Sequence, residues 1–176
     1  MKHHIDKTLL SATKIAARIE ELAQEITDDF SDDGEITIVP ILTGSIIFTA
    51  DLIRQIKLPM RINLITVSSY PGSAIRSQGA TVLGQQLGNI KGSHVLLVDD
   101  ILDSGTTIRA VVPLLKELGA AKVRVAVLLN KNKPEAAGAP CDFVGFNIPD
   151  EFVVGYGLDY DSYYRNLPNI VTLKGV

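Results

Sequence analysis

Apolar positions repeat at helical spacing within the first thirty residues. Four of them share one face of the predicted helix: Ile15, Ile19, Leu22 and Ile26. Ser11 precedes them and can cap the start of the helix. The apolar run 36–42 then predicts a strand, after which Thr43-Gly44-Ser45 opens a second apolar helix. The pattern is therefore helix, strand, small-residue turn and helix.

A second strand–turn–helix unit lies at the centre of the chain. The apolar residues Val95–Val98 predict a strand that is buried on both faces of a parallel sheet. The run breaks into acids, a glycine and hydroxyls between Asp99 and Thr107, and helical spacing then continues to Gly119. We expect the polar part to form a loop at the carboxyl end of the strand, where open α/β sheets bind ligands.

The rest of the chain predicts five more strands and one long polar loop. Residues 68–79 are polar, contain glycine and lack periodicity, which in a compact domain is typical of a functional or disordered loop. Residues 133–140 form a connector without clear structure. The predicted strands are 60–67, 81–84, 122–129, 141–149 and 170–173. Strands that alternate with helices indicate an α/β fold.

Composition narrows the class of protein. The 176 residues, 46% of them hydrophobic, fit one globular domain. The net charge of −3 argues against a general nucleic-acid binder. The single cysteine, Cys141, excludes an internal disulfide and a cysteine-based zinc site, and it fits a cytoplasmic location. No apolar run has the length of a membrane span, and Met1–His4 lacks the apolar core of a signal peptide.

The residues between Asp103 and Thr107 have the composition of an anion site. They precede a predicted helix, Gly105 permits close approach of the backbone, and hydroxyls and free N–H groups can point at one anion. Asp99 and Asp100 lie just upstream, where they would repel a phosphate but can hold ribose hydroxyls or a magnesium ion. A phosphate cup beside two acids indicates a sugar phosphate as the ligand.

Other candidate groups fall on the same side of the predicted sheet. Thr43-Gly44-Ser45 forms a second small-residue turn before a helix, which is either an anion site or an ordinary turn. Lys131 follows a strand at its carboxyl end. Aromatic residues make up only 6% of the chain, yet three fall between positions 150 and 160. They form either a stacking platform for a planar base or a small satellite core.

Two parts of the chain resemble the type I phosphoribosyltransferases. Residues 98–107 are similar to the signature that binds 5-phosphoribosyl-1-pyrophosphate (PRPP). Residues 152–160 and 164–168 resemble the C-terminal hood of hypoxanthine-guanine phosphoribosyltransferases, and the similarity runs from about Pro40 to the C-terminus. The resemblance implies a single domain over 1–176, with a mostly parallel sheet flanked by helices in a core at about 10–130. A small hood would comprise 131–176 and the N-terminal residues.

The resemblance further implies a purine-salvage enzyme. Such an enzyme transfers the phosphoribosyl group from PRPP to hypoxanthine, and also to guanine, and releases IMP or GMP and pyrophosphate. Mg²⁺ is the implied cofactor. The implied partners are small molecules, with no nucleic acid and no membrane. The resemblance also implies a homodimer or a homotetramer.

The site residues are carried over by position. Asp103 is the implied general base near N7 of the purine. PRPP and its 5′-phosphate would contact Asp99, Asp100, Ser104, Gly105, Thr106 and Thr107. Pyrophosphate would contact Leu42, Thr43, Gly44, Ser69, Tyr70 and Arg165, with Ser69 and Tyr70 at the start of a catalytic loop. The purine would contact Lys131, Phe152, Val153 and Asp159, and the magnesium ligands would be Asp99, Asp100 and Asp159.

Two positions depart from the family pattern. Thr43 stands where many members carry lysine, which leaves backbone N–H groups to serve the pyrophosphate. The family often has a cis peptide bond at this point. Asp99 stands where the family usually has glutamate, and because aspartate is one methylene shorter, we expect a water-bridged contact.

Two other functions fit the same signature. The first is a xanthine-preferring phosphoribosyltransferase, because Lys131 would donate to a 6-oxo group, which adenine lacks but xanthine carries. The second is a PRPP-sensing regulator that has lost catalysis. Such a regulator should carry a basic nucleic-acid face or an extra domain, and this acidic chain shows neither.

Overall fold

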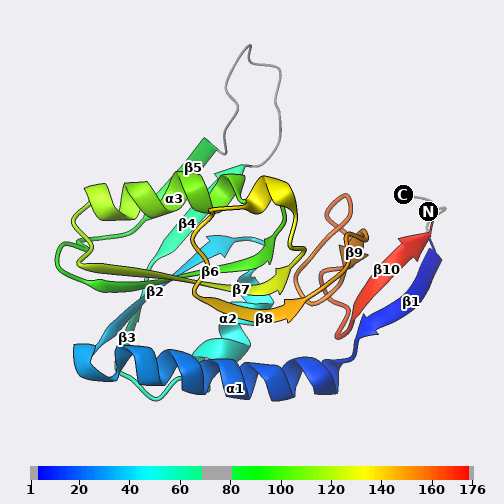
Figure 1. The fold of residues 1–176 in the computed structure, drawn as a ribbon, viewed down its shortest axis with the longest axis horizontal. Coiled ribbons are helices and arrows are strands. Elements are labelled where there is room, and N and C mark those ends of the chain that lie inside the picture. The colour runs from blue at the N-terminus through cyan, green and yellow to red at the C-terminus, as the bar shows by residue number, and fades with distance from the viewer. Residues whose placement is uncertain (1–3, 69–80, 175–176) are drawn as a thin grey trace, which may run out of the picture.

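A seven-stranded sheet forms the centre of the computed structural model, which describes residues 4–68 and 81–174 (Figure 1). Its strand order is β5-β4-β2-β6-β7-β8, with β3 also paired to β2. The strands are β2 (Ile36–Leu42), β3 (Met60–Ile62), β4 (Leu64–Ser68), β5 (Thr81–Gln86), β6 (His94–Leu102), β7 (Lys122–Asn130) and β8 (Phe143–Asn147). Only the β4–β5 pairing is antiparallel, so the predicted mostly parallel sheet is confirmed.

Helices cover both faces of this sheet. The two helices α1 (Ala12–Phe30) and α2 (Ile46–Ile53) lie on one face, and α3 (Thr106–Glu117) lies on the other (Figure 1). Short 3₁₀ turns follow α1 (Ser31–Asp33) and β7 (Pro134–Ala136). The predicted N-cap of α1 is confirmed, because the Ser11 hydroxyl accepts a hydrogen bond from the backbone N–H of Lys14 at 3.3 Å.

The central strand β6 is buried on both faces. Leu96 and Val98 pack into the core on the side of α1 and α2, whereas Val95 and Leu97 pack into the core on the side of α3. All four side chains are fully shielded from solvent. This double burial is why the strand reads as a continuous apolar run rather than an alternating one.

A small antiparallel sheet joins the two ends of the described chain. Its order is β1-β10-β9, with β1 at His4–Leu10, β9 at Val153–Val154 and β10 at Ile170–Lys174. Figure 1 shows it at one end of the large sheet, with β1 and β10 side by side. The apolar pattern did not predict β1, because most of its side chains are exposed and pairing with β10 creates the strand.

Residues 60–67 do not form the single strand that their alternation predicts. Asn63 separates β3 from β4: its backbone N–H donates to the Ile38 carbonyl at 2.9 Å and its amide to the Leu87 carbonyl at 2.6 Å. Both halves still pair with β2. The predicted short strand 81–84 is confirmed as part of β5, while 69–80 of the predicted loop lie outside the described residues.

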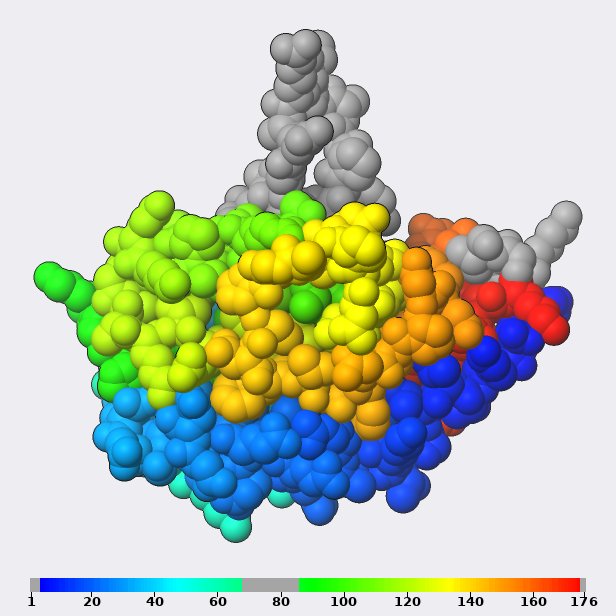
Figure 2. Space-filling model, viewed as in Figure 1, coloured from blue at the N-terminus to red at the C-terminus, as the bar shows by residue number. Residues whose placement is uncertain are grey.

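The segment between β7 and β9 covers one side of the molecule. Figure 2 shows residues 131–150, in yellow to orange, as a band between α3 and α1. Arg18 of α1 fastens this band, since its guanidinium donates to the carbonyls of Val144 and Gly145, each at 3.0 Å. Among the helices that the structure describes, none is long and apolar enough to cross a membrane.

Candidate active site

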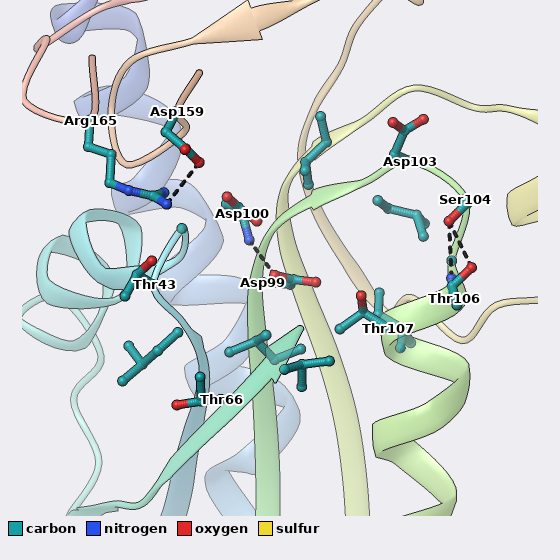
Figure 3. A pocket seen from close by; sticks show the side chains of 18 residues that line it. Thr43, Thr66, Asp99, Asp100, Asp103, Ser104, Thr106, Thr107, Asp159 and Arg165 are labelled. Carbon is teal, nitrogen blue, oxygen red and sulfur yellow. Dashed lines mark hydrogen bonds and ion pairs between the residues drawn. The ribbon is translucent and has the colours of Figure 1, made fainter. Parts of the chain in front are cut away.

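A cavity of about 560 Å³ opens at the carboxyl ends of β2, β4 and β6 (Figure 3). Figure 3 shows Asp99 and Asp100 in the middle, with Arg165 and Asp159 on one side and the loop of Ser104 on the other. Most of the predicted site residues line it: Leu42, Thr43, Gly44, Asp99, Asp100, Asp103, Ser104, Gly105, Thr106, Thr107, Asp159 and Arg165. The topology thus brings together segments far apart in sequence.

The loop before α3 has the shape of an anion cup. Gly105 is the residue that precedes the helix, and its φ of 76° lies in the left-handed region that favours glycine. The hydroxyls of Ser104 and Thr106 are 2.9 Å apart, so they converge on one spot. Arg109 braces the loop from within α3, because its guanidinium donates to the Ser104 carbonyl at 2.8 Å. Free N–H groups at this helix start favour an anion there.

The two acids lie within the strand and not in the loop that the sequence predicts. The β6–β7 ladder continues through Asp99, which pairs with Val127, to Leu102, so both acids belong to β6. Asp99 is buried, and its Oδ1 accepts the Asp100 N–H at 3.0 Å. Burial and the neighbouring Asp100 carboxylate raise the pKa of Asp99 well above its usual value, and burial raises the pKa of Asp100 as well. A cation or a hydrogen-bond donor in the cavity would relieve this pair.

The loop between β2 and α2 approaches the acids closely. The Leu42–Thr43 peptide bond is cis, the form that the family resemblance implies. A Cβ atom on Gly44 would lie 1.8 Å from the Asp100 carboxylate, and a Cβ on Gly157 would lie 2.2 Å from the Gly44 carbonyl. Because a larger residue at either position would clash, the two glycines allow the hood, the loop before α2 and Asp100 to lie in contact. The Thr43 side chain is exposed at the rim of the cavity.

Arg165 lines the cavity on the side of the hood. Its guanidinium contacts the Asp159 carboxylate at 2.8 Å and donates to the Gly157 carbonyl at 2.6 Å. The Asp159 carboxylate also accepts the Ser162 N–H at 2.8 Å. Arg165 thus faces the acids and the Thr43 loop while its own position is held by the hood (Figure 3).

The ends of β6 and β7 place an acid beside a lysine. Leu102 and Asn130 are paired in the ladder, so the next residues, Asp103 and Lys131, emerge at the same edge. The Lys131 ammonium lies 3.6 Å from the Asp103 carboxylate and 3.2 Å from that of Asp150. The Lys131 side chain is only 9% exposed, and these two acids compensate the charge that it buries beside the cavity.

Of the four predicted purine residues, Asp159 lines the cavity, whereas Lys131, Phe152 and Val153 lie outside its lining. Phe152 is 43% exposed and meets Tyr160 edge to face, with ring centroids 5.5 Å apart. Its accessible ring suits the stacking platform better than the satellite core. Val153 is buried in β9. The predicted pyrophosphate residues Ser69 and Tyr70 lie outside the described residues.

Several cavity and cluster residues were not predicted. Thr66 and Val67 line the cavity from the end of β4, Lys133 contacts Asp103, and Asp150 contacts Lys133 and Lys131. The position of Thr66 at a strand's carboxyl end was an available signal. No local pattern marks Asp150 or Lys133, because they join the group around Asp103 only through the packing of three strand ends.

A magnesium site made of protein groups alone does not form in the described part of the chain. No three histidine, cysteine or acidic side chains there are grouped to hold a metal ion. The Asp99–Asp100 pair nevertheless fits Mg²⁺, which is often held by one or two carboxylates together with substrate phosphates. Asp159 faces the same cavity, with its carboxylate on Arg165.

Comparisons with known proteins agree with this geometry. The family model for the phosphoribosyl transferase domain matches residues 6–161. The hypoxanthine-guanine phosphoribosyltransferase of Bacillus subtilis is 38% identical over 174 residues, 99% of this chain and 96% of that protein. The hypoxanthine phosphoribosyltransferase of Haemophilus influenzae is 40% identical over 168 residues, 94% of this chain and 93% of that protein.

Solved structures show the same relationship. A hypoxanthine-guanine phosphoribosyltransferase from Bacillus anthracis superposes with a TM-score of 0.87 at 37% identity, over 98% of this chain and 99% of that one. A mutant hypoxanthine phosphoribosyltransferase from Trypanosoma cruzi, in a ternary substrates complex, superposes with a TM-score of 0.90 at 36% identity, over 97% and 96%. The chain therefore belongs to the phosphoribosyltransferase family, among its hypoxanthine and hypoxanthine-guanine members.

Proposed function

We propose that this protein transfers the 5-phosphoribosyl group of PRPP to N9 of hypoxanthine or guanine. The products are IMP or GMP and pyrophosphate, and the role is purine salvage. One observation carries the proposal: Asp103 lies between the anion cup and the Lys131 ammonium, so a phosphate site and a base site meet at one carboxylate. A nucleoside monophosphate has the same two ends.

The phosphoribosyl end is bound by the cup and the acids. Ser104 to Thr107 take the 5′-phosphate with hydroxyls and with N–H groups at the start of α3. Asp99 and Asp100 accept hydrogen bonds from the ribose 2- and 3-hydroxyls. Burial disfavours the charged form of both acids and raises their pKa values, and hydroxyl donors would offset that effect. Because Asp99 is shorter than the usual glutamate, water bridges its contact.

Pyrophosphate leaves on the side of the ribose that faces the loop between β2 and α2. Backbone N–H groups from Leu42 to Gly44 and the Arg165 guanidinium receive its charge as the bond to C1 breaks. Ser69 and Tyr70 would add hydroxyls, a role that follows from the family resemblance. Mg²⁺, held by Asp99 and Asp100 with Asp159 as a third candidate ligand, supplies further charge stabilisation when bound.

The purine end is recognised by charge and stacking. The Lys131 ammonium donates to the 6-oxo group, where adenine carries an amino group and offers no acceptor. Phe152 stacks on the base, and the backbone carbonyls of Val153 and Asp159 accept the 2-amino group of guanine. Asp103 takes the purine proton near N7 as the nucleophile attacks. Its Oδ1 is shielded from solvent and lies 2.8 Å from the Lys133 ammonium, which keeps the carboxylate in place for this step.

We also expect this enzyme to act as a homodimer or homotetramer in the cytoplasm. A single cysteine suits a reducing compartment. Ile46 and Ile47 of α2 are 49% and 37% exposed, an apolar surface that a second copy would cover. Light scattering of the purified protein measures the assembly directly.

The test is a base panel. Hypoxanthine, guanine, xanthine and adenine are each incubated with PRPP and Mg²⁺, and pyrophosphate release and nucleotide formation are followed. We expect turnover with hypoxanthine and guanine and none with adenine. Preference for xanthine would instead support the xanthine enzyme, and PRPP binding without turnover of any base would support the regulator.

A further inference from the structure

Four charged side chains from three segments meet at the edge of the purine site. Asp103 follows β6, Lys131 and Lys133 follow β7, and Asp150 follows β8. The Lys133 ammonium lies 2.8 Å from Asp103 Oδ1 and 2.8 Å from Asp150 Oδ1. Two ammonium groups and two carboxylates therefore share a cluster whose net charge is zero.

Lys133 is the nearer cation for both acids. The Lys131 ammonium is 3.6 Å from Asp103 and 3.2 Å from Asp150, which in both cases exceeds the distance to Lys133. If Lys131 alone neutralised the acids, its turning toward a base oxygen would leave two carboxylates without a close cation. With Lys133 in place, Lys131 can reorient at little electrostatic expense.

A set of asparagines fixes the direction of both lysines. Asn132, between them, has a φ of 51°, a left-handed conformation that asparagine tolerates better than most residues. The Asn132 N–H donates to Asn130 Oδ1 at 2.9 Å, and Asn130 Nδ2 donates to Asn132 Oδ1 at 2.7 Å. Asn132 Nδ2 also donates to Asn147 Oδ1 of β8 at 3.0 Å. The lysines thus leave a turn that is tied to two strands.

Lys133 and Asp150 stabilise each other's charged forms. The carboxylates of Asp103 and Asp150 raise the pKa of the Lys133 ammonium above its usual value. Lys133 and Lys131 in turn lower the pKa of Asp150. Lys133 therefore keeps its proton throughout the range in which the enzyme works, and its contribution is a constant positive charge.

We propose that Lys133 is a positioning residue of the purine site, which holds Asp103 and Asp150 so that Lys131 is released to the oxygen of the base. This inference rests on the proposed function. Lys133 does not touch the reacting atoms in this scheme: it acts through its two acid partners. The competing interpretation is a plain surface ion pair, which the 26% exposure of the Lys133 side chain also permits.

Steady-state kinetics with both substrates distinguish these interpretations. Lys133→Met removes the charge and keeps most of the length, and Lys133→Arg keeps the charge. Lys116→Met, in the exposed last turn of α3, is the matched control for loss of one lysine charge. We expect Lys133→Met to raise KM for hypoxanthine roughly tenfold, the scale of a lost charge-assisted hydrogen bond. KM for PRPP should stay within about twofold, and Lys133→Arg and Lys116→Met should resemble wild type.

Asp150→Asn is the second variant, because it removes one of the two acids that would otherwise hold Lys131. Alone it should leave KM for hypoxanthine near the wild-type value, and combined with Lys133→Met it should restore part of the affinity that Lys133→Met loses. Equal changes in both KM values, or a Lys133→Met that matches Lys116→Met, would overturn the inference. If wild type forms no nucleotide from any base, the proposed function itself fails, which is a separate result.

Discussion

Asp103 has two properties at once that a proton acceptor needs. Its Oδ1 is shielded from solvent and lies 2.8 Å from the Lys133 ammonium, and its Oδ2 lies 3.6 Å from the Lys131 ammonium, so two cations hold it in place. In the primary structure it is one acid among three within five residues. Its neighbours Asp99 and Asp100 lie in β6, whereas Asp103 lies beyond the end of that strand and so faces a different group.

Asp103→Asn tests the proton transfer. We expect kcat to fall by about 10²–10⁴-fold, because asparagine cannot take a proton. The fold should survive, since the amide is nearly isosteric. Initial rates at saturating PRPP and hypoxanthine measure the effect, and circular dichroism serves as the folding control. Unchanged turnover would remove Asp103 from the mechanism.

Lys131→Ala tests recognition of the base. KM for hypoxanthine and guanine should rise at least tenfold, because the ammonium's bond to the 6-oxo group is lost. KM for PRPP should change little, since its groups bind at the opposite end of the cavity. Saturation curves for each substrate measure the KM values. An equal loss for base and PRPP would mean that Lys131 is structural.

At the scale of elements, the site depends on close approach of the hood to the loop before α2. Gly157 has a φ of 101°, and an added Cβ would lie 2.2 Å from the Gly44 carbonyl. Gly34, with a φ of 79° and nothing within 4 Å of an added Cβ, offers the matched case without crowding.

Gly157→Ala should therefore destabilise the protein by more than Gly34→Ala. The control should lose about 1 kcal/mol from the backbone conformation alone, whereas crowding should bring the loss at Gly157 to about 2–3 kcal/mol. Urea unfolding measures both variants. KM for PRPP should rise only in Gly157→Ala, and equal losses of stability in the two variants would show that hood and loop can separate freely.

The ion pairs that join α1 to the start of β7 predict an acid dependence of stability. Burial by itself raises the pKa of Asp29, but hydrogen bonds from Arg124 and Lys122 outweigh it, and the pKa lies below the usual 3.8. Because the folded-state pKa is lowered, the stabilisation is complete above the unfolded value and is lost as the pH falls through the folded value.

Asp29→Asn should accordingly lower stability by on the order of 1 kcal/mol at pH 5–7. The difference from wild type should shrink below about pH 4, where the wild-type carboxyl takes up its proton. Urea midpoints at pH 7, 5 and 3.5 give the three points. A difference that is the same at all three pH values would show that the charge of Asp29 is irrelevant.

At the scale of the whole molecule, the hydrophobic core extends from the large sheet into the hood. Val153, Tyr156, Leu158 and Ile170 belong to the same buried cluster as the residues of α1, α2 and β6. Arg18 of α1 holds the band 131–150 that connects β7 to β9. We therefore propose that the chain is one domain in the thermodynamic sense, as its length suggests.

A single cooperative transition is the expected result on heating. Four of the five tyrosines, 156, 160, 163 and 164, lie in the hood, and the chain has no tryptophan. Tyrosine fluorescence therefore reports the hood, while far-ultraviolet circular dichroism at the helix band reports α1 to α3. The two melting curves should coincide. A fluorescence change that precedes the loss of helix would identify the hood as a separate unit.

Local patterning determined most of the elements of this protein and the nature of its phosphate cup. The helical spacing before Ile26, the apolar runs of β2, β6 and β7, and the composition of 103–107 are properties of adjacent residues, so the chain reveals them directly. The strand β1 and the break at Asn63 were beyond such patterns, because each depends on a partner elsewhere: β10 for the first, β2 and Leu87 for the second.

Only the tertiary structure decided which charges meet. The register that pairs Leu102 with Asn130 sets Asp103 beside Lys131, and the return of β8 adds Asp150 to the same point. Continuation of the β6 ladder buries Asp99, and two glycines let the hood reach the acids. Side-chain type follows from the sequence, whereas proximity, burial and the pKa values that follow from them arise when parallel strands end together at one edge of a sheet.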